Sequence, residues 1–328
     1  VVVFVGGGIW LATDEPTGLP PSLADPVVVD LVLEPDPEPV IEPFVEPVPR
    51  PPTMATPIDV AVAAHVEPPA WQQHAVAPPT AAPGTPMIAL LIDDMGEARM
   101  WSDHIVALPG PLTLAYFPHV PDLVEQVDAA RRGGHEIMLH LPMEPKDRAE
   151  NPGPDPLLTG LDAEALRRRT MAMLDSVDGY VGVNNHMGSR FTTDEAAMAL
   201  VLAEVQDRGL LFVDSRTTPD SVGERLARAL GVPTLRRDIF LDNHADGPLI
   251  EAQLAALERH ARDHGYAIAI AHPRPDTIAA LAGWLPGLFE RGFFLAPIST
   301  IVARHQSTDL LPANEPTGAN LFNGGVIL

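Results

Sequence analysis

The chain has 328 residues, 46% of them hydrophobic, and its 44 acidic and 21 basic residues give a formal net charge of −23 at pH 7. This excess of negative charge excludes nucleic acid as a partner and makes anionic lipid headgroups unattractive. The chain has no cysteine, which excludes disulfides and thiolate ligands, so any metal would have to be held by histidines and carboxylates.

The N-terminal part of the chain is predicted to contain no folded domain. Residues 1–12 (VVVFVGGGIWLA) are apolar but shorter than the roughly 20 residues that span a bilayer, and we interpret them as the remnant of a signal peptide or membrane anchor. Residues 13–86 hold 19 of the 37 prolines and a four-residue Glu-Pro repeat. Proline lacks an amide donor and fixes φ, so this segment is predicted to be a disordered, semi-rigid linker. The arrangement suggests a domain of the cell envelope, either periplasmic or anchored to the inner membrane, outside the cytoplasm.

Between residues 87 and 304, short apolar runs alternate with amphipathic stretches. The runs predict strands at 87–92, 112–116, 136–139, 179–183, 210–213, 239–241, 267–271 and 293–296. The stretches between them predict helices at 98–107, 121–132, 162–176, 193–208, 221–230, 248–264 and 277–291. Asp162 and Thr193 are the expected N-caps. The alternation predicts a mainly parallel α/β fold, and its seven or eight repeats favour an irregular barrel over an open sheet. Residues 305–328 are interpreted as a C-terminal tail.

Polar residues follow the predicted strands at the points where the apolar runs stop. They are Asp93 and Asp94, His140, His186, Asp214, Asp242 and His272. Active sites of parallel α/β folds lie at the carboxyl ends of the strands, so these side chains are predicted to gather on one rim. Each has a simpler interpretation: a lone histidine forms ordinary hydrogen bonds, and an aspartate after a strand caps the next helix. Asp242 fits a helix cap well, and Asp214 and Asp94 are also compatible with one.

Several of these segments resemble the motifs of the divergent polysaccharide deacetylase family, a relative of the metal-dependent NodB-like polysaccharide deacetylases. The matching segments appear in the family's order: IDDMG, GHEIMLHLPMEP, NNHMGSRFT, FVDSRT, FLDN and a final HP. The resemblance covers residues 87–304 and leaves out the linker. It implies a NodB-like (β/α) barrel of seven or eight strands, acting on an acetylated glycan of the bacterial envelope.

The resemblance also implies roles for individual residues. Asp93 would be the general base, Asp94 a metal ligand and His140 the second ligand. His272 would be the general acid that protonates the leaving amine, and Asp214 would orient a catalytic partner. A divalent metal is therefore implied, with zinc as the expected ion.

The sequence departs from the parent family at two places. Glu144 stands where the parent family has a second histidine ligand, so the third ligand is either Glu144 or His186, and the NNHMGSR segment favours His186. The parent's Arg-x-Pro-Tyr motif is missing, and Arg190 occupies that neighbourhood, where it would stabilise an oxyanion or orient Asp93.

The sequence thus predicts a metal-dependent hydrolase that removes acetyl groups from an N-acetylated envelope glycan. The main alternative is a catalytically degenerate relative that binds glycan or an envelope protein. A phosphoester or carboxylester hydrolase with the same site is a third possibility.

Overall fold

The computed structural model describes residues 67–78, 80, 82–244 and 246–309. The chain divides into two units, Val1–Ala63 and Ala64–Leu328, and every described residue belongs to the second. The predicted anchor remnant and most of the predicted linker lie outside the described residues. Within the described part of the chain, no helix has the length and apolar character needed to cross a membrane.

Strands of the described chain form one sheet in which every recorded pairing is parallel. Its hydrogen-bonded order is β6-β5-β4-β3-β2-β1-β8-β7, and β9 pairs with β1 in addition. The strands are β1 (Met87–Met95), β2 (Thr113–Tyr116), β3 (Glu136–Met143), β4 (Gly182–Met187), β5 (Leu211–Asp214), β6 (Thr234–Arg236), β7 (Ile239–Phe240), β8 (Tyr266–Ala271) and β9 (Phe294–Leu295). Each predicted strand corresponds to one of these, and β6 is the strand that the sequence did not predict.

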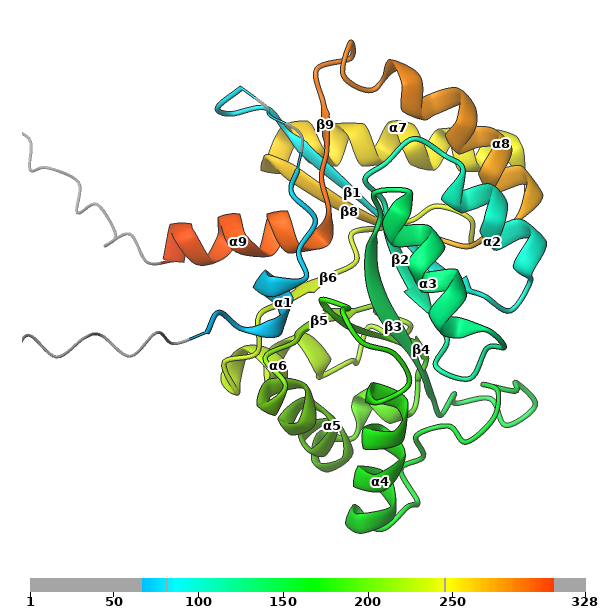
Figure 1. Ribbon diagram of the computed structural model, residues 1–328, viewed down its shortest axis with the longest axis vertical. Helices are drawn as coiled ribbons and strands as arrows, with labels where there is room; N and C mark the ends of the chain where they lie inside the picture. Colours follow the sequence, from blue (N-terminus) through cyan, green and yellow to red (C-terminus); the bar gives the residue numbers. More distant parts are fainter. Residues whose placement is uncertain (1–66, 79, 81, 245, 310–328) are drawn as a thin grey trace, which may run out of the picture. The chain divides into compact units, whose positions relative to one another are not determined.

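The sheet is curled, and the two strands at its ends are close together in the sequence. β6 and β7 stand at opposite ends of the pairing order, yet only two residues, Arg237 and Asp238, separate them in the chain. A seam therefore lies between β6 and β7, and the sheet is a half-barrel rather than a closed one. Helices surround it in Figure 1. The predicted irregular (β/α) barrel is confirmed, with eight strands along its continuous path.

The helices fall where the amphipathic stretches predict them, apart from one at each end of the described chain. They are α1 (Ala70–Gln73), α2 (Arg99–Val106), α3 (Leu123–Arg132), α4 (Ala163–Leu174), α5 (Glu195–Asp207), α6 (Gly223–Ala229), α7 (Gly247–His264), α8 (Pro275–Trp284) and α9 (Ile298–Asp309). The predicted cap of α4 is confirmed, because Asp162 accepts from the amide of Ala165 at 2.7 Å. The cap of α5 is Asp194 rather than Thr193, whose hydroxyl instead donates to the carbonyl of Arg190.

α1 and α9 extend the folded domain beyond the predicted limits. α1 lies inside the stretch assigned to the linker, and its Trp71 is 3% exposed, with its amide bonded to the carbonyl of Gly209 at 3.0 Å. α9 runs through Asp309, past the predicted start of the tail at residue 305. Both helices are held by apolar side chains, Trp71 on α1 and Ile298, Ile301 and Val302 on α9, which belong to one buried cluster.

Side chains on one face of the sheet fill the inside of the curl. They include Ala89 and Leu91 of β1, Leu211 and Val213 of β5, and Ile268 and Ile270 of β8, all in the same buried cluster as α9. Successive strand residues point to opposite faces, so the next inward positions are two residues further on. On these three strands they are Asp93, Ser215 and His272. The inside of the curl is therefore apolar along the strands and becomes polar at their carboxyl ends.

The amino end of the curl is closed by a buried carboxylate. Glu136 is fully buried at the start of β3 and accepts hydrogen bonds from the Thr113 hydroxyl at 3.0 Å and the Ser299 amide at 3.1 Å. Its second oxygen bonds the Ser299 hydroxyl. Because Ser299 lies in the first turn of α9, Glu136 fastens this helix to the sheet at a position where a helix favours negative charge.

This carboxylate predicts a specific pH dependence of stability. Burial raises the pKa of Glu136 above its ordinary value, although the hydrogen bonds from Ser299 and Thr113 oppose the shift. A carboxyl group whose pKa is raised by folding stabilises the folded state at low pH and loses that contribution as the pH rises through the folded pKa. We expect the free energy of unfolding of the wild type, relative to the Glu136→Gln variant, to fall as the pH rises above about 4.5, by at most about 1.4 kcal/mol per pH unit. Urea unfolding of both proteins across this range measures the difference, and a difference that grows with pH would contradict the assignment.

Candidate metal centre and catalytic site

Asp93 and Asp94 face the same site although they are neighbours in a strand. Asp94 has φ of 55°, in the left-handed region, and the pairing of β1 with β2 shifts register between Ile92 and Met95. This irregularity breaks the alternation that would send the two side chains to opposite faces. As a result, Nε2 of His140 lies 3.6 Å from an oxygen of Asp93 and 3.3 Å from an oxygen of Asp94.

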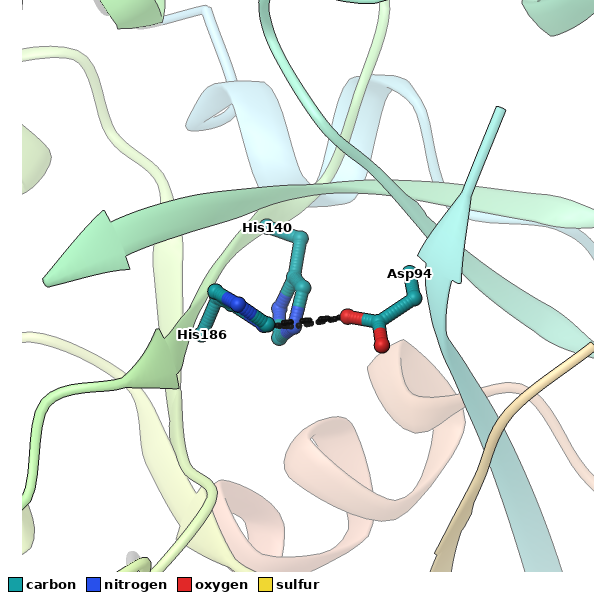
Figure 2. A group of neighbouring side chains, drawn as sticks. All are labelled: Asp94, His140 and His186. Atoms are coloured by element: carbon teal, nitrogen blue, oxygen red, sulfur yellow. Dashed lines mark hydrogen bonds and ion pairs between the residues drawn. The ribbon is translucent and has the colours of Figure 1, made fainter. Parts of the chain in front are cut away.

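Asp94, His140 and His186 converge on one point, as Figure 2 shows. Oδ1 of Asp94 lies 3.3 Å from Nε2 of His140 and 3.0 Å from Nδ1 of His186. The two imidazole nitrogens are 3.2 Å apart. In the described part of the chain, this is the group of histidines and carboxylates with the spacing to hold a metal ion.

The geometry of this group fits a divalent ion. Four ligands placed tetrahedrally at 2.0–2.1 Å from zinc are separated from one another by about 3.3 Å, close to the three separations in this group. Oδ1 of Asp94 is buried among the two imidazole nitrogens without a well-formed hydrogen bond in the described structure, and a cation between the three atoms would satisfy it. Nδ1 of His140 lies 2.9 Å from Oδ1 of Asn184, a contact that orients the ring and leaves Nε2 for the metal.

β3 and β4 are longer than predicted, and their extra residues hold two of these side chains. His140 and His186 lie within strands rather than after them, because the ladder continues to the pair Met143 and Met187. In this ladder His140 is opposite Asn184, and Pro142 is opposite His186. The parallel register thus sets both imidazoles on the same face, two positions apart.

The two aspartates have opposite electrostatic environments. Burial alone would raise the pKa of Asp94, but the imidazoles of His140 and His186 outweigh it and hold this pKa far below the ordinary value. For Asp93, which is 3% exposed, burial is the larger effect and raises the pKa, although His140, His272 and a hydrogen bond from Asn184 oppose it. Asp94 is therefore suited to remain an anionic ligand, whereas Asp93 is suited to accept a proton.

Asn184 links Asp93 to the rest of the site and was not among the residues predicted from the sequence. Its Nδ2 donates to Asp93 at 2.8 Å and to the hydroxyl of Ser215 at 3.1 Å, while its Oδ1 contacts His140. The signal for it was present in the sequence. Asn184 precedes His186 by two residues and therefore shares its face of β4.

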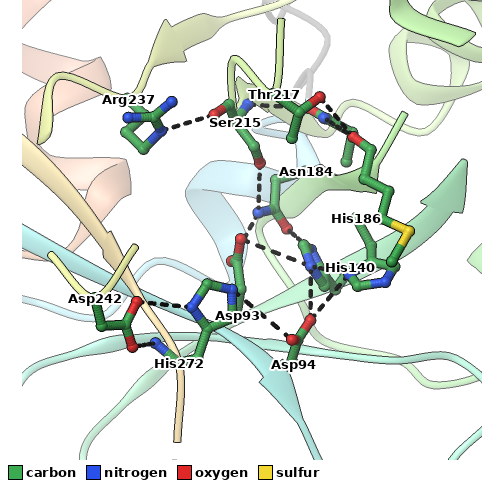
Figure 3. Close-up of polar contacts among 12 residues, drawn as sticks. Asp93, Asp94, His140, Asn184, His186, Ser215, Thr217, Arg237, Asp242 and His272 are labelled. Atoms are coloured by element: carbon green, nitrogen blue, oxygen red, sulfur yellow. Dashed lines mark hydrogen bonds and ion pairs between the residues drawn. The ribbon is translucent and has the colours of Figure 1, made fainter. Parts of the chain in front are cut away.

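His272 is oriented by Asp242, as Figure 3 shows. Nδ1 of His272 donates to Asp242 at 2.8 Å, and the second carboxylate oxygen accepts from the His272 amide and the Thr277 hydroxyl, each at 2.8 Å. Nε2 of His272 lies 3.8 Å from Asp94. Burial would lower the pKa of His272, but Asp242 and the other nearby carboxylates raise it, which favours the imidazolium form. The interpretation of Asp242 as a helix cap is wrong, since Asp246 caps α7.

Asp214 makes no recorded contact in the described structure with His272 or with the proposed metal ligands, so its predicted role of orienting a catalytic partner lacks support. One of its oxygens accepts from the Ser221 hydroxyl at 2.7 Å and the Glu224 amide at 3.1 Å, and the other accepts from the Arg216 amide at 2.9 Å. Glu224 lies in the first turn of α6, so Asp214 anchors that helix and the loop before it. The simpler interpretation of Asp214, as a helix cap, describes it better.

Glu144 and Arg190 pair with each other instead of completing the site. Nε of Arg190 lies 3.3 Å from one oxygen of Glu144, and the other oxygen accepts from the amide and hydroxyl of Thr159, each at 2.8 Å. Of the two candidates for the third ligand, the structure brings His186 to Asp94 and His140, and Glu144 is not in that group. Arg190 forms no recorded contact with Asp93 in the described structure, so the role proposed for it beside Asp93 lacks support.

These side chains line a cavity of about 560 Å³ at the carboxyl ends of the strands. Asp93, Asp94, His140, His186 and His272 all border it. Backbone strain is concentrated here as well. Among the described residues with a side chain and positive φ, Asp94, Met187 and Arg216 all line this cavity. A fold retains such conformations mainly where function requires them.

Comparison with known proteins agrees with the motifs and the fold. The profile of the divergent polysaccharide deacetylase family matches residues 90–302. An uncharacterized protein from Haemophilus influenzae is 36% identical over 205 residues, which cover 62% of this chain and 72% of that protein. The uncharacterized protein YibQ from Escherichia coli is 32% identical over 196 residues, 59% of this chain and 60% of its own length.

A solved structure shows the same fold. The crystal structure of the uncharacterized protein ATU2773 from Agrobacterium tumefaciens superimposes with a TM-score of 0.68 at 31% identity, covering 71% of this chain and 95% of that one. The family profile covers most of the domain, and the ordered motifs, the half-barrel and the polar carboxyl rim all agree with it. The chain therefore belongs to the divergent polysaccharide deacetylase family.

Proposed function

We propose that the protein is a divalent-metal-dependent hydrolase that removes acetyl groups from an N-acetylated glycan. The observation that carries this proposal is the convergence of Asp94, His140 and His186 on one point, with a second carboxylate, Asp93, beside them. A group that only ligated a metal would not need a buried carboxylate at this distance with a raised pKa.

Asp94, His140 and His186 would hold the ion, and the donor set of two imidazoles and one carboxylate suits zinc in a chain without cysteine. A divalent ion bound there supplies Lewis acidity toward the acetyl carbonyl and toward the attacking water. A set of three protein ligands is typical of catalytic rather than structural zinc sites.

Asp93 would act as the general base. Its Oδ1 is held by Asn184 at 2.8 Å, and its other oxygen faces His140 at 3.6 Å, next to the ligand group. Burial raises its pKa toward the range in which a carboxylate accepts a proton from water and later releases it. Asn184 fixes the side chain, so that the free oxygen is directed to the reaction centre.

His272 would act as the general acid that protonates the leaving amine. Asp242 holds Nδ1 and leaves Nε2 directed toward the cavity, on the side of Asp94. The carboxylates around it raise the pKa of His272 and keep a proton available on the ring. A base and an acid placed at one centre, with different environments, are what amide hydrolysis needs. An envelope glycan as the substrate remains a prediction from the resemblance.

Metal content tests the ligand assignment. We expect the purified protein to bind about one equivalent of zinc, and His186→Ala to weaken zinc binding by about tenfold or more because one ligand is lost. Glu144→Gln is the matched control, since Glu144 is adjacent in the fold but bonded to Thr159 and Arg190. Competition with a chromophoric chelator measures both variants. Equal weakening in the two would contradict the assignment of His186.

Turnover tests the role of Asp93. The substitution Asp93→Asn keeps the hydrogen bond partners of the side chain but removes the base, so we expect acetate release from N-acetylglucosamine oligomers to fall by about 100-fold or more. Zinc affinity should change little, because Asp93 is outside the ligand group. An Asp93→Asn protein with wild-type activity would exclude the role. A wild-type protein that binds zinc and the oligomer but releases no acetate would support the non-catalytic alternative.

Substitutions of Asp242 and Asp214 are expected to have different effects on kcat and on stability. Asp242→Asn should lower kcat by about 10- to 100-fold without a change in zinc affinity, because His272 loses the carboxylate that orients its ring. Asp214→Asn should lower the melting temperature and leave kcat close to the wild-type value, because Asp214 anchors α6. The two measurements on both variants separate the roles. A kcat defect in Asp214→Asn as large as that in Asp242→Asn would restore the role that the sequence predicted for Asp214.

A further inference from the structure

Arginines are concentrated on the cavity that contains the proposed metal site. Arg216, Arg237 and Arg274 line it, and none of them forms an ion pair with a carboxylate in the described part of the chain. Elsewhere guanidinium groups are commonly paired, as in Arg190 with Glu144. The contrast is notable because acidic residues outnumber basic ones by 44 to 21. The cavity therefore contains three guanidinium groups without an ion-pair partner among the described residues.

Arg237 is fixed by carbonyl oxygens rather than by acids. Its Nε donates to the carbonyl of Ser215 at 2.8 Å, and a terminal nitrogen donates to the carbonyl of Arg216 at 2.9 Å. The guanidinium also lies 5.0 Å from the centre of the Phe240 ring. These contacts set the orientation of the planar group but give it no ion pair, since a carbonyl has no net charge.

Arg216 stands beside Arg237 in an unfavourable backbone conformation. Its φ is 48°, and this conformation is held by its own amide, which donates to Asp214 at 2.9 Å, and by its carbonyl, which accepts from Arg237. Its guanidinium makes no hydrogen bond within the described structure. Burial lowers the pKa of Arg237, and the like charge of Arg216 lowers it further. Two adjacent cations and a strained backbone are features that a ligand site explains and stability does not.

Asp93 and Asp94 on the cavity have partners other than these arginines. Asp93 bonds Asn184, and Asp94 faces His140 and His186. Asp93 is near enough to Arg237 to influence its pKa, yet the two form no ion pair. Glu150, the other carboxylate on the cavity, is exposed and unpaired with them in the described structure. The guanidinium groups of Arg216 and Arg237 can thus form ion pairs with an anionic group of a ligand.

Arg216 and Arg237 also connect the cavity of the proposed metal site with a neighbouring cavity, because they line both. Both line a second cavity of about 440 Å³, together with Arg236, Asp238 and His260. Arg237 and Asp238 form the link between β6 and β7, so this second cavity lies along the seam of the half-barrel. A glycan bound at the metal site and longer than one sugar could extend past the two guanidinium groups.

We infer that Arg216 and Arg237 form a subsite for an anionic group of the substrate, a carboxylate or a phosphate, on the acetylated sugar or its neighbour. The inference rests on the proposed function and defines the substrate class more closely, as an acetylated glycan with acidic substituents. Guanidinium groups suit this task because their planar donors match the oxygens of carboxylate and phosphate.

The test compares anionic ligands with closely related neutral ones. Binding is measured by calorimetry with the full chain, loaded with zinc, in an Asp93→Asn background that stops turnover. The carboxylate probe is a tetrasaccharide alternating N-acetylglucosamine and N-acetylmuramic acid, and its control is the same molecule with the lactyl carboxylates amidated. The phosphate probe is N-acetylglucosamine 6-phosphate, compared with N-acetylglucosamine.

The variant Arg216→Met removes a guanidinium that makes no protein hydrogen bond, so the fold should persist, as circular dichroism and zinc content will verify. Arg132→Met is the matched control, because Arg132 is an exposed arginine in the last turn of α3 and does not line the cavity. We expect at least one anionic probe to bind about tenfold more tightly than its neutral control. Arg216→Met should remove this advantage and leave neutral binding within about twofold, while Arg132→Met changes neither. The probe that shows the advantage identifies carboxylate or phosphate as the group bound.

Two results would overturn the inference. Equal binding of anionic and neutral probes would exclude the subsite and leave the proposed deacetylation intact, since the neutral sugar still binds. Equal weakening of both kinds of probe by Arg216→Met would show that Arg216 supports the cavity rather than an anion. If none of the probes binds, the subsite and the glycan substrate fail together, and the zinc measurement then shows whether the metal site survives.

Discussion

The parallel register between β3 and β4 is the constraint on which the site depends. It sets His140 opposite Asn184 and Pro142 opposite His186, so that both imidazoles lie on one face of the sheet, two positions apart. From this arrangement follow the 3.2 Å separation of their nitrogens and the position of Asn184, which contacts both His140 and Asp93. A shift of one residue in this pairing would move these side chains to the opposite face and remove the ligand group.

The irregular end of β1 directs two adjacent aspartates toward the same site. A regular strand would present only one of two adjacent aspartates to the interior. The left-handed conformation of Asp94 brings both carboxylates to His140, and their different surroundings then shift their pKa values in opposite directions. Asp94 is surrounded by imidazoles that keep it ionised, whereas Asp93 is more deeply buried and has a raised pKa. The repulsion expected of an acid pair is thus offset by His140 and His186, and it would be offset further by a bound cation.

The sequence was informative where a single period or motif determines the outcome. Apolar runs located every strand except β6, which has three residues and no run of its own, and the ends of those runs predicted the common rim on which Asp93 and His272 lie. What failed was the pairing of partners distant in sequence. Asp214 and Asp242 both follow strands, and only the fold shows that Asp242 reaches His272 while Asp214 reaches α6. Glu144 likewise matched a ligand position by spacing, but Thr159 and Arg190 draw it away.

The chain has a net negative charge, whereas the guanidinium groups of Arg216 and Arg237 on the cavity are positive, and both would act on an anionic ligand. Residues 13–86 hold 11 acidic residues and one basic residue, and residues 87–309 hold 32 acidic and 20 basic residues, so the excess is spread over the sequence. At physiological ionic strength, charges more than about 8 Å apart in solvent are largely screened from each other. Arg216 and Arg237 are partly buried at the opening of the site, where screening is weaker and no carboxylate pairs with them. An anionic ligand would therefore gain little from long-range attraction, and its selection would depend on direct contact with these two guanidinium groups.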